Sequence, residues 1–403
     1  DTLERTADEN ARLMSLEMGK TLTASYAELE KCAAFCRHMA GHAKAYLADQ
    51  PVETEHVAAY SRPLPLGVIL LVMPWNFPMW QAVRALAPAI MAGNTMLLKH
   101  ASNVQGSAKW MHDIMDEAGA PKGLFANLCI GSRKVERVLA DERVAAATLT
   151  GSEGAGSAVA STAGKYLKKV VLELGGSDPF IVMPTADLDA AAAAATKART
   201  QNTGQSCICG KRMIVHADVY DAFVKKFTAA MKAVKVGDPF ASDTDIGPLS
   251  SFDQRDEVIR QVANAREQGG ELLFGAEQPG GDCADGAYLT PGVIAGLDPD
   301  CDAAHDEIFG PVALLFKAAD IDEAIAIANN SPFGLGGAVF TQDKAEEARF
   351  TAEVETGMLA INQMLASDPN APFGGIKRSG HGRELAPFGL HEFMNLKTIF
   401  RKG

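Results

Sequence analysis

The sequence has few of the features that would place a protein in a membrane, on nucleic acid or outside the cell. Its longest apolar stretch, Leu66 to Trp75, is interrupted by Gly67 and Pro74 and is too short to span a bilayer. The net charge of −12 over 403 residues argues against a general nucleic-acid or anionic-membrane surface. With no signal peptide at its start, the chain is expected to be soluble and cytoplasmic.

The spacing of cysteine and histidine residues also gives little sign of metal sites or disulfides. The seven cysteines are an odd number without framework spacing, which indicates a reducing compartment. The nine histidines are scattered and form no zinc motif. Cys32 and Cys36 share one face of a helix predicted from Ala24 to Tyr46, but no histidine joins them there. We therefore expect these two cysteines to pack in the core, and we expect no metal site.

Apolar runs alternate with helix-forming stretches along the first half of the chain. The run from Leu66 to Val72 is typical of a strand buried on both faces of a parallel sheet. Three further strands are expected at residues 94–99, 126–130 and 145–150. Strands that alternate with helices predict an α/β fold with a doubly wound, parallel sheet of the Rossmann type.

Two segments near the start suggest contacts beyond this core. The chain opens on a helix without a capping residue, which indicates that an N-terminal piece is missing. The alternating residues from Val52 to Pro65 predict an exposed strand pair, and a second subunit is one way to cover such an edge.

A turn-like segment from Asn202 to Arg212 carries the most reactive candidate, Cys207. Gly204 allows the chain to bend sharply there. Nearby cations, of which Lys211 is one candidate, would favour the nucleophilic thiolate. The alternative is that Cys207 is a small buried hydrophobic residue.

Two polar residues interrupt apolar surroundings at the ends of predicted strands. Glu173 lies inside the run Val170 to Leu174, where burial would raise the pKa of its carboxyl toward that of a general base. Asn76 follows a predicted strand and could donate to an oxyanion, or it could simply form a turn. The Gly151-Ser152 turn at a helix N-terminus suits a phosphate but lacks the G-x-G-x-x-G register.

Five motifs occur in one order along the chain: Pro74-Trp75-Asn76-Phe77-Pro78, Glu173-Leu174-Gly175-Gly176, Gly204-Gln205-Ser206-Cys207, Glu307-Ile308-Phe309-Gly310-Pro311-Val312 and Pro372-Phe373-Gly374-Gly375. Together they resemble the NAD(P)-dependent aldehyde dehydrogenase superfamily over essentially the whole chain. Within it, three segments are most similar to bacterial and cyanobacterial succinate-semialdehyde dehydrogenases: Leu98 to Ala101, Glu173 to Pro179 and the tail Gly389 to Phe393. Members of this family usually carry some tens of residues before the point where this chain starts.

The resemblance implies a role for each matching residue. Cys207 would be the nucleophile, Asn76 with the Cys207 N–H would hold the oxyanion, and Glu173 would activate the deacylating water. The cofactor-binding residues would be Trp75, Lys99, Ser102, Gly151, Ser152, Glu307 and Phe309. The cofactor would be NADP in preference to NAD, because Ser102 stands where NAD-preferring relatives have a glutamate that would repel the 2′-phosphate.

Further residues are expected to bind the substrate and to respond to oxidation. Arg84 lies two helical turns after Asn76 and would bind the substrate carboxylate, helped by Ser367; the alternative is a surface arginine. Cys209 would form a reversible disulfide with Cys207, or would only pack.

The implied organisation has three parts: a cofactor-binding domain from residues 1–48 and 67–174, a catalytic domain from 175–370, and a small β oligomerisation element from 49–66 and 371–403. The expected assembly is a homodimer or homotetramer. The expected reaction oxidises succinate semialdehyde to succinate. Alternatives are another small aldehyde, a coenzyme-A-acylating dehydrogenase and a non-catalytic protein on this fold.

Overall fold

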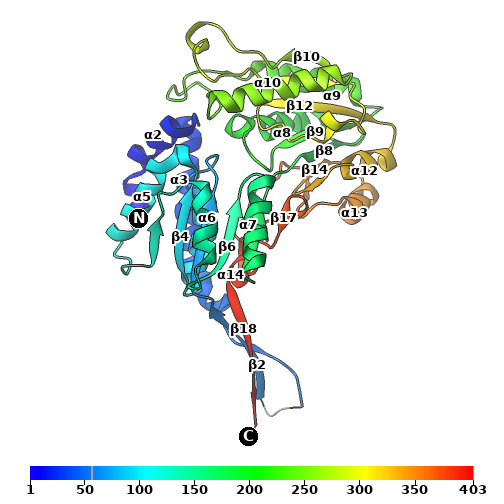
Figure 1. Ribbon diagram of the computed structural model, residues 1–403. Coiled ribbons are helices and arrows are strands. Elements are labelled where there is room, and N and C mark those ends of the chain that lie inside the picture. The colour runs from blue at the N-terminus through cyan, green and yellow to red at the C-terminus, as the bar shows by residue number, and fades with distance from the viewer. Residues whose placement is uncertain (56–57, 403) are drawn as a thin grey trace.

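Two lobes, each built on its own sheet, and a projecting arm make up the protein (Figure 1). The computed structural model describes residues 1–55 and 58–402. The described helices include none that is long and apolar enough to cross a membrane.

The first lobe contains a six-stranded sheet in the order β17-β7-β6-β3-β4-β5. Its strands are β3 (Val68–Met73), β4 (Thr95–His100), β5 (Phe125–Asn127), β6 (Val144–Thr150), β7 (Lys169–Glu173) and β17 (Gly380–His381). The helices that follow these strands are α4 (Trp80–Met91), α5 (Gln105–Glu117), α6 (Val135–Ala140) and α7 (Glu153–Lys165). Strands β3 to β7 are parallel, as the alternation of strands and helices predicts.

Two details of this sheet differ from the prediction. Strand β5 ends at Asn127 rather than at Ile130, and its ladder with β4 covers only three residue pairs. The edge strand β17 comes from the far end of the chain and pairs antiparallel with β7, opposite Glu173 and Leu172. Sequence periodicity cannot reveal a two-residue strand of this kind, because such a strand depends on the neighbour that it meets.

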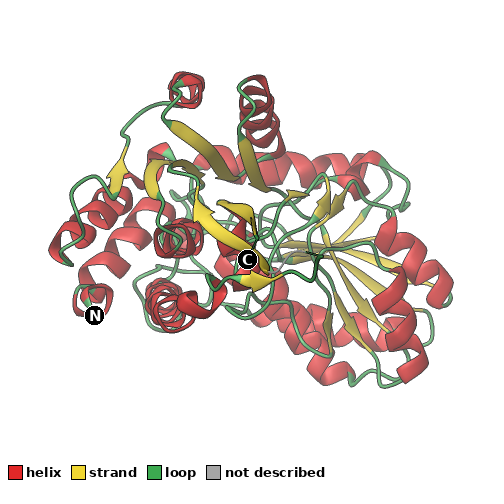
Figure 2. Cartoon of the chain, turned by 90° about the horizontal axis from the view of Figure 1, so that it is seen from below, coloured by secondary structure: helices red, strands yellow, loops and turns green. Residues whose placement is uncertain are grey.

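The second lobe contains a seven-stranded sheet in the order β10-β11-β12-β9-β8-β14-β15. Its strands are β8 (Asp178–Val182), β9 (Gly210–His216), β10 (Glu271–Gly275), β11 (Gly292–Ala295), β12 (Val312–Ala318), β14 (Ala338–Phe340) and β15 (Ala360–Ile361). Its helices are α8 (Leu188–Thr200), α9 (Tyr220–Ala233), α10 (Phe252–Glu267), α11 (Asp302–His305), α12 (Ile321–Asn329) and α13 (Lys344–Glu353). Figure 2 shows helices flanking this fan of strands, so most of its strands are buried on both faces.

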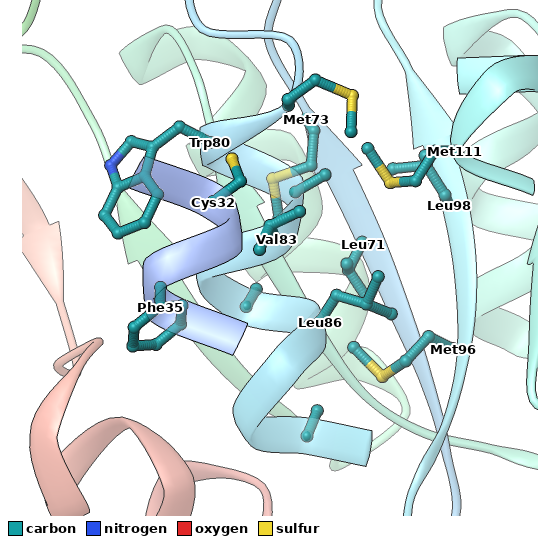
Figure 3. Packing of buried hydrophobic residues seen from close by; sticks show 14 of the residues in the cluster. Cys32, Phe35, Leu71, Met73, Trp80, Val83, Leu86, Met96, Leu98 and Met111 are labelled. Atoms are coloured by element: carbon teal, nitrogen blue, oxygen red, sulfur yellow. The ribbon is translucent and has the colours of Figure 1, made fainter. Parts of the chain in front are cut away.

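The N-terminal helices α1 (Thr2–Arg5), α2 (Ala7–Met18) and α3 (Leu22–Tyr46) complete the first lobe. Figure 3 shows Cys32 and Phe35 of α3 beside Trp80 and Val83 of α4. The rings of Phe35 and Trp80 meet edge to face at 5.5 Å. Cys32 is fully buried in this cluster, as expected for a packing residue. Cys36 is exposed, so the expectation of core packing is wrong for that residue. This contact fixes α3 against α4, and both helices contribute side chains to the site.

The arm is a three-stranded antiparallel sheet of β1 (Gln50–Pro51), β2 (Ala58–Pro65) and β18 (Met394–Arg401). It projects from the first lobe and carries the C-terminus at its tip (Figure 1). The exposed strand pair predicted between residues 52 and 65 is thus partly right, since β2 pairs mainly with the distant β18. Residues 56 and 57 of that prediction lie outside the described residues.

Short elements join these parts. They are β13 (Phe333–Gly334), β16 (Ile376–Lys377), α14 (Ala386–Glu392) and the 3-10 turns η1 (Ser102–Val104), η2 (Ser132–Lys134), η3 (Gln201–Gly204) and η4 (Gly281–Cys283).

Candidate active site

The loop that carries Cys207 follows α8 and contains three consecutive residues in the left-handed backbone region. Their φ angles are 52° at Asn202, 57° at Thr203 and 76° at Gly204. A β-carbon on Gly204 would collide with the carbonyl of Gly310, so only glycine fits there. Strained backbone of this kind persists only where surrounding contacts hold it. The sharp bend expected at Gly204 is confirmed.

Arg199 at the end of α8 supplies several of the contacts that stabilise this loop. Its guanidinium is fully buried and donates to the carbonyls of Gly204 at 3.0 Å and Ile308 at 3.1 Å, and also to that of Gly310. One side chain therefore ties the cysteine loop to the loop that carries Glu307. A buried guanidinium needs several acceptors to offset its desolvation, and these carbonyls provide them.

Asn76 lies at the carboxyl end of β3 and faces the cysteine loop. Its Nδ2 donates to the Gln205 carbonyl at 3.0 Å, while Asn202 Nδ2 donates to the Asn76 carbonyl at 2.8 Å. The side chain is 4% exposed, and its Oδ1 is buried without a hydrogen-bond partner. The structure thus brings the Asn76 amide to the backbone two residues before Cys207.

Cys207 is partly exposed, and burial raises the pKa of its thiol to about 12. The positive charges of Arg84 and Lys211 act in the opposite direction but are outweighed. Lys211 Nζ donates to the carbonyls of Ser206 and Cys207, both at 2.8 Å. Nearby cations therefore favour the thiolate, as expected, but desolvation is the larger contribution to the pKa of Cys207.

Glu173 ends β7 and is 2% exposed, with neither carboxyl oxygen hydrogen-bonded. Burial, reinforced by the nearby Glu384, raises the pKa of this carboxyl well above its usual value. The expectation of a raised pKa at Glu173 is confirmed. A β-carbon on Gly374 would lie 2.6 Å from Glu173 Oε1, so the glycine pair after Phe373 leaves room for this side chain.

The residues assigned to the dinucleotide lie at one edge of the first sheet, at or just after the carboxyl ends of the parallel strands β4 and β6, which flank β3. Lys99 lies in β4 and Ser102 opens η1, whereas Gly151 and Ser152 follow β6. Ser152 caps α7 and accepts from the Ala155 N–H at 3.4 Å. Open α/β sheets bind ligands at this edge, and a helix N-terminus favours phosphate. The arrangement fits a dinucleotide.

A second group of assigned residues lies between the lobes. Glu307 accepts from the Gly176 N–H at 3.0 Å and pairs with Lys211 at 3.2 Å. The rings of Trp75 and Phe309 meet edge to face at 5.8 Å. The structure thus brings Trp75 close to Phe309, and it pairs Glu307 with the lysine that binds the Cys207 carbonyl.

A cavity of about 920 Å³ leads to Cys207. Its lining includes Arg84, Ser367, Lys31, Phe77 and Phe373. Apolar rings and polar groups therefore share its wall, as in most small-molecule sites.

Arg84 is 2% exposed, so the alternative of a surface arginine is wrong. Its guanidinium pairs with the buried Glu384 and lies over the Phe373 ring, 4.3 Å from the centroid. Its Nη2 is buried without a hydrogen-bond partner. Ser367 accepts from Lys31 Nζ at 2.5 Å.

Cys209 is fully buried, and its Sγ contacts the Gln201 carbonyl at 3.8 Å. This contact is compatible with packing and leaves the thiol in the same loop as Cys207.

Sequence reasoning missed Arg199, Lys31 and Glu384. Each is a charged residue that packing buries or half-buries, and its partner is distant in the sequence. The one local signal is at Arg199, a charge at the end of a helix rich in alanine.

Comparisons with known proteins agree with this geometry. The model of the aldehyde dehydrogenase family matches residues 1–399, and the chain belongs to this family. Two curated relatives are each 53% identical to this chain over 403 residues, or 99% of its length. One is succinate-semialdehyde dehydrogenase [NADP(+)] 1 of Mycobacterium tuberculosis, of which the match covers 88%. The other is the succinate-semialdehyde dehydrogenase [NADP(+)] of Mycolicibacterium paratuberculosis, of which it covers 85%. Among solved structures, the succinic semialdehyde dehydrogenase of Streptococcus pyogenes in complex with NADP+ is similar, with a TM-score of 0.96 and 41% identity over 100% of this chain and 88% of that one.

The raised pKa of Glu173 gives a prediction about stability. Below the carboxyl's ordinary pKa, the group is protonated in the folded and unfolded states, so it adds no pH dependence to the free energy of unfolding. As pH rises, the unfolded chain releases this proton first, so the folded state loses up to about 1.4 kcal/mol per pH unit until Glu173 ionises. Glu173→Gln should therefore gain stability over the wild type as pH rises, in urea unfolding followed from pH 4 upward. Glu271→Gln, at an exposed site, is the control. A difference for Glu173→Gln that does not vary with pH would contradict the assignment.

Proposed function

We propose that the protein oxidises succinate semialdehyde to succinate with NADP as the preferred cofactor and NAD as an accepted one. The observation that carries the proposal is that Cys207, in a loop bonded by the Asn76 amide, lies in the wall of a cavity with cationic side chains. The buried carboxyl of Glu173 supports the role of a base. The similar relatives are named as NADP-dependent succinate-semialdehyde dehydrogenases, which supports the same substrate and cofactor.

In the proposed reaction the Cys207 sulfur, once deprotonated, adds to the aldehyde carbon. The second N–H of the Asn76 amide and the Cys207 backbone N–H stabilise the resulting oxyanion. NADP supplies the acceptor for the hydride that leaves this carbon. Glu173 then accepts a proton from the water that attacks the Cys207 thioester, and succinate and the free thiol are released. One water is consumed and two protons are released for each aldehyde.

The chain's own residues would hold the cofactor. Lys99 and Ser102 would bind the adenine ribose and its phosphate, and Gly151 and Ser152 the pyrophosphate at the N-terminus of α7. Glu307 would bind the nicotinamide ribose, with Trp75 and Phe309 beside the ring. Gly175 has no room for a β-carbon because the Glu307 carboxylate lies against it, which supports a fixed position for that carboxylate.

We also propose the domain division predicted from the sequence, except that Gly380–His381 join the first sheet as β17, with a homodimer or homotetramer as the assembly and the cytoplasm as its location. Support for oligomerisation comes from the projecting arm, where Leu396 is 54% exposed. A monomer in light scattering at working concentrations would contradict this assembly.

The main test of the function compares the rates of oxidation of several aldehydes. With NADP, absorbance of the reduced cofactor should rise faster with succinate semialdehyde than with butanal at equal concentration. Arg84→Ala should raise KM strongly for the carboxylated aldehyde, because a charge-assisted contact is lost. Product formation that requires coenzyme A would favour an acylating enzyme, and no reduction with any aldehyde would favour a non-catalytic protein. Equal losses with both aldehydes in Arg84→Ala would leave Arg84 with a packing role.

Cofactor preference depends on Ser102 in this proposal. Ser102 is exposed and can donate to a 2′-phosphate, whereas a glutamate would repel it. We expect Ser102→Glu to raise KM for NADP roughly tenfold or more and to reverse the preference toward NAD. Ser102→Ala, which adds no charge, should change the ratio much less. A wild type strongly selective for NAD would contradict the argument.

A redox role for Cys209 is the last part of the proposal. Peroxide would oxidise Cys207 to the sulfenic acid, and the Cys209 thiol would displace water from it to form a disulfide. The wild type should lose activity in mild peroxide and regain it with a thiol reductant, whereas Cys209→Ala should recover poorly. If that variant is inactivated and rescued like the wild type, Cys209 only packs.

A further inference from the structure

Lys31 is a charged residue of the cavity that the proposed reaction does not use. It lies on α3 and lines the same cavity as Cys207, Arg84 and Ser367. Its Nζ donates to Ser367 Oγ at 2.5 Å and lies 4.4 Å from the centre of the Trp80 ring. The ammonium is therefore fixed from two sides, by a hydroxyl and by an aromatic face.

The charges around Lys31 are largely committed to other partners. Arg84 pairs with Glu384. Glu28 pairs with Lys20 through Oε2, while its Oε1 accepts from the N–H groups of Met79 and Trp80, each at 2.8 Å. These contacts use the carboxylates that are buried in this part of the wall.

Lys31 itself has no carboxylate oxygen within 4.0 Å among residues 1–55 and 58–402. The groups that act on it electrostatically are Arg84, Cys32, Glu28 and Asp368. Burial, followed by repulsion from Arg84, lowers the pKa of Lys31. A half-buried ammonium in this setting is costly unless an anion joins it.

We propose that Lys31, together with Ser367, binds the carboxylate of a short ω-carboxylated aldehyde and supplies the positive charge that selects it. This inference rests on the proposed function. Arg84 has its charge matched by Glu384, so it contributes hydrogen-bond donors, whereas Lys31 contributes the unmatched charge. A lysine has three N–H donors, and Ser367 uses one of them, which leaves donors for a carboxylate. Lys31 is thus a substrate-binding residue on the N-terminal helices.

The test compares substrates and variants at saturating NADP. Lys31→Met removes the charge at nearly constant length, and Lys31→Arg keeps the charge. We expect Lys31→Met to raise KM for succinate semialdehyde roughly tenfold or more, with kcat and the KM for butanal nearly unchanged. Lys31→Arg should retain most of the discrimination. Lys44→Met, at an exposed site near the end of the same helix, is the matched control and should behave as the wild type.

A second measurement follows the pH dependence of KM in the wild type. Because the pKa of Lys31 lies below its usual value, the ammonium loses its proton as pH rises through that lowered value. The KM for succinate semialdehyde should then rise with pH relative to the KM for butanal, in the range below the ordinary pKa of lysine. Cys207 titrates for both substrates, so the ratio of the two KM values isolates the carboxylate contact. In Lys31→Arg this ratio should stay constant over the same range.

The outcomes separate this inference from the function on which it rests. A wild type that does not prefer succinate semialdehyde over butanal overturns the proposed function. A wild type with that preference, retained in Lys31→Met and independent of pH, overturns only the assignment of Lys31. Equal losses with both aldehydes in Lys31→Met would show that Lys31 merely supports the packing of Trp80.

Discussion

The site depends on one buried guanidinium. Arg199 binds backbone carbonyls of the cysteine loop and of the 307–310 loop at once, and both loops belong to the second lobe. The three left-handed residues before Gln205 give that loop a shape that it would not hold alone. With the loop fixed, the Asn76 amide from the first lobe reaches its backbone, and the two lobes share one reactive centre.

Charged groups at the site differ in whether they form ion pairs. Arg84 pairs with Glu384 and Lys20 with Glu28. Glu173 and Lys31 are among the groups of the described chain that form no ion pair, and their formal charges are opposite. Burial raises the pKa of Glu173 and lowers the pKa of Lys31, so it favours the neutral form of each side chain. A group poised in this way can take up a proton or an ion from the substrate at small cost, which suits a base and a binding residue respectively.

The glycine motifs have a shared purpose that becomes visible only in three dimensions. Gly374 leaves space for the Glu173 carboxyl, and Gly175 leaves space for the Glu307 carboxylate. A side chain at either position would displace a functional carboxylate. These glycines therefore shape the site by leaving out a side chain, and Gly374 also adopts a φ of 145° that other residues rarely take.

Much of this protein followed from local sequence alone. The run of apolar residues in β3, its alternation with helices, and the placement of Asn76 and Cys207 in loops depend on neighbours a few residues away, so periodicity predicted them. The resemblance of five motifs gave the family. Only the tertiary structure decided that desolvation outweighs the cations near Cys207, that Arg84 meets Glu384, and that Lys31 lines the same cavity as Cys207. Those facts depend on burial and on partners from distant parts of the chain, which no spacing in the sequence encodes.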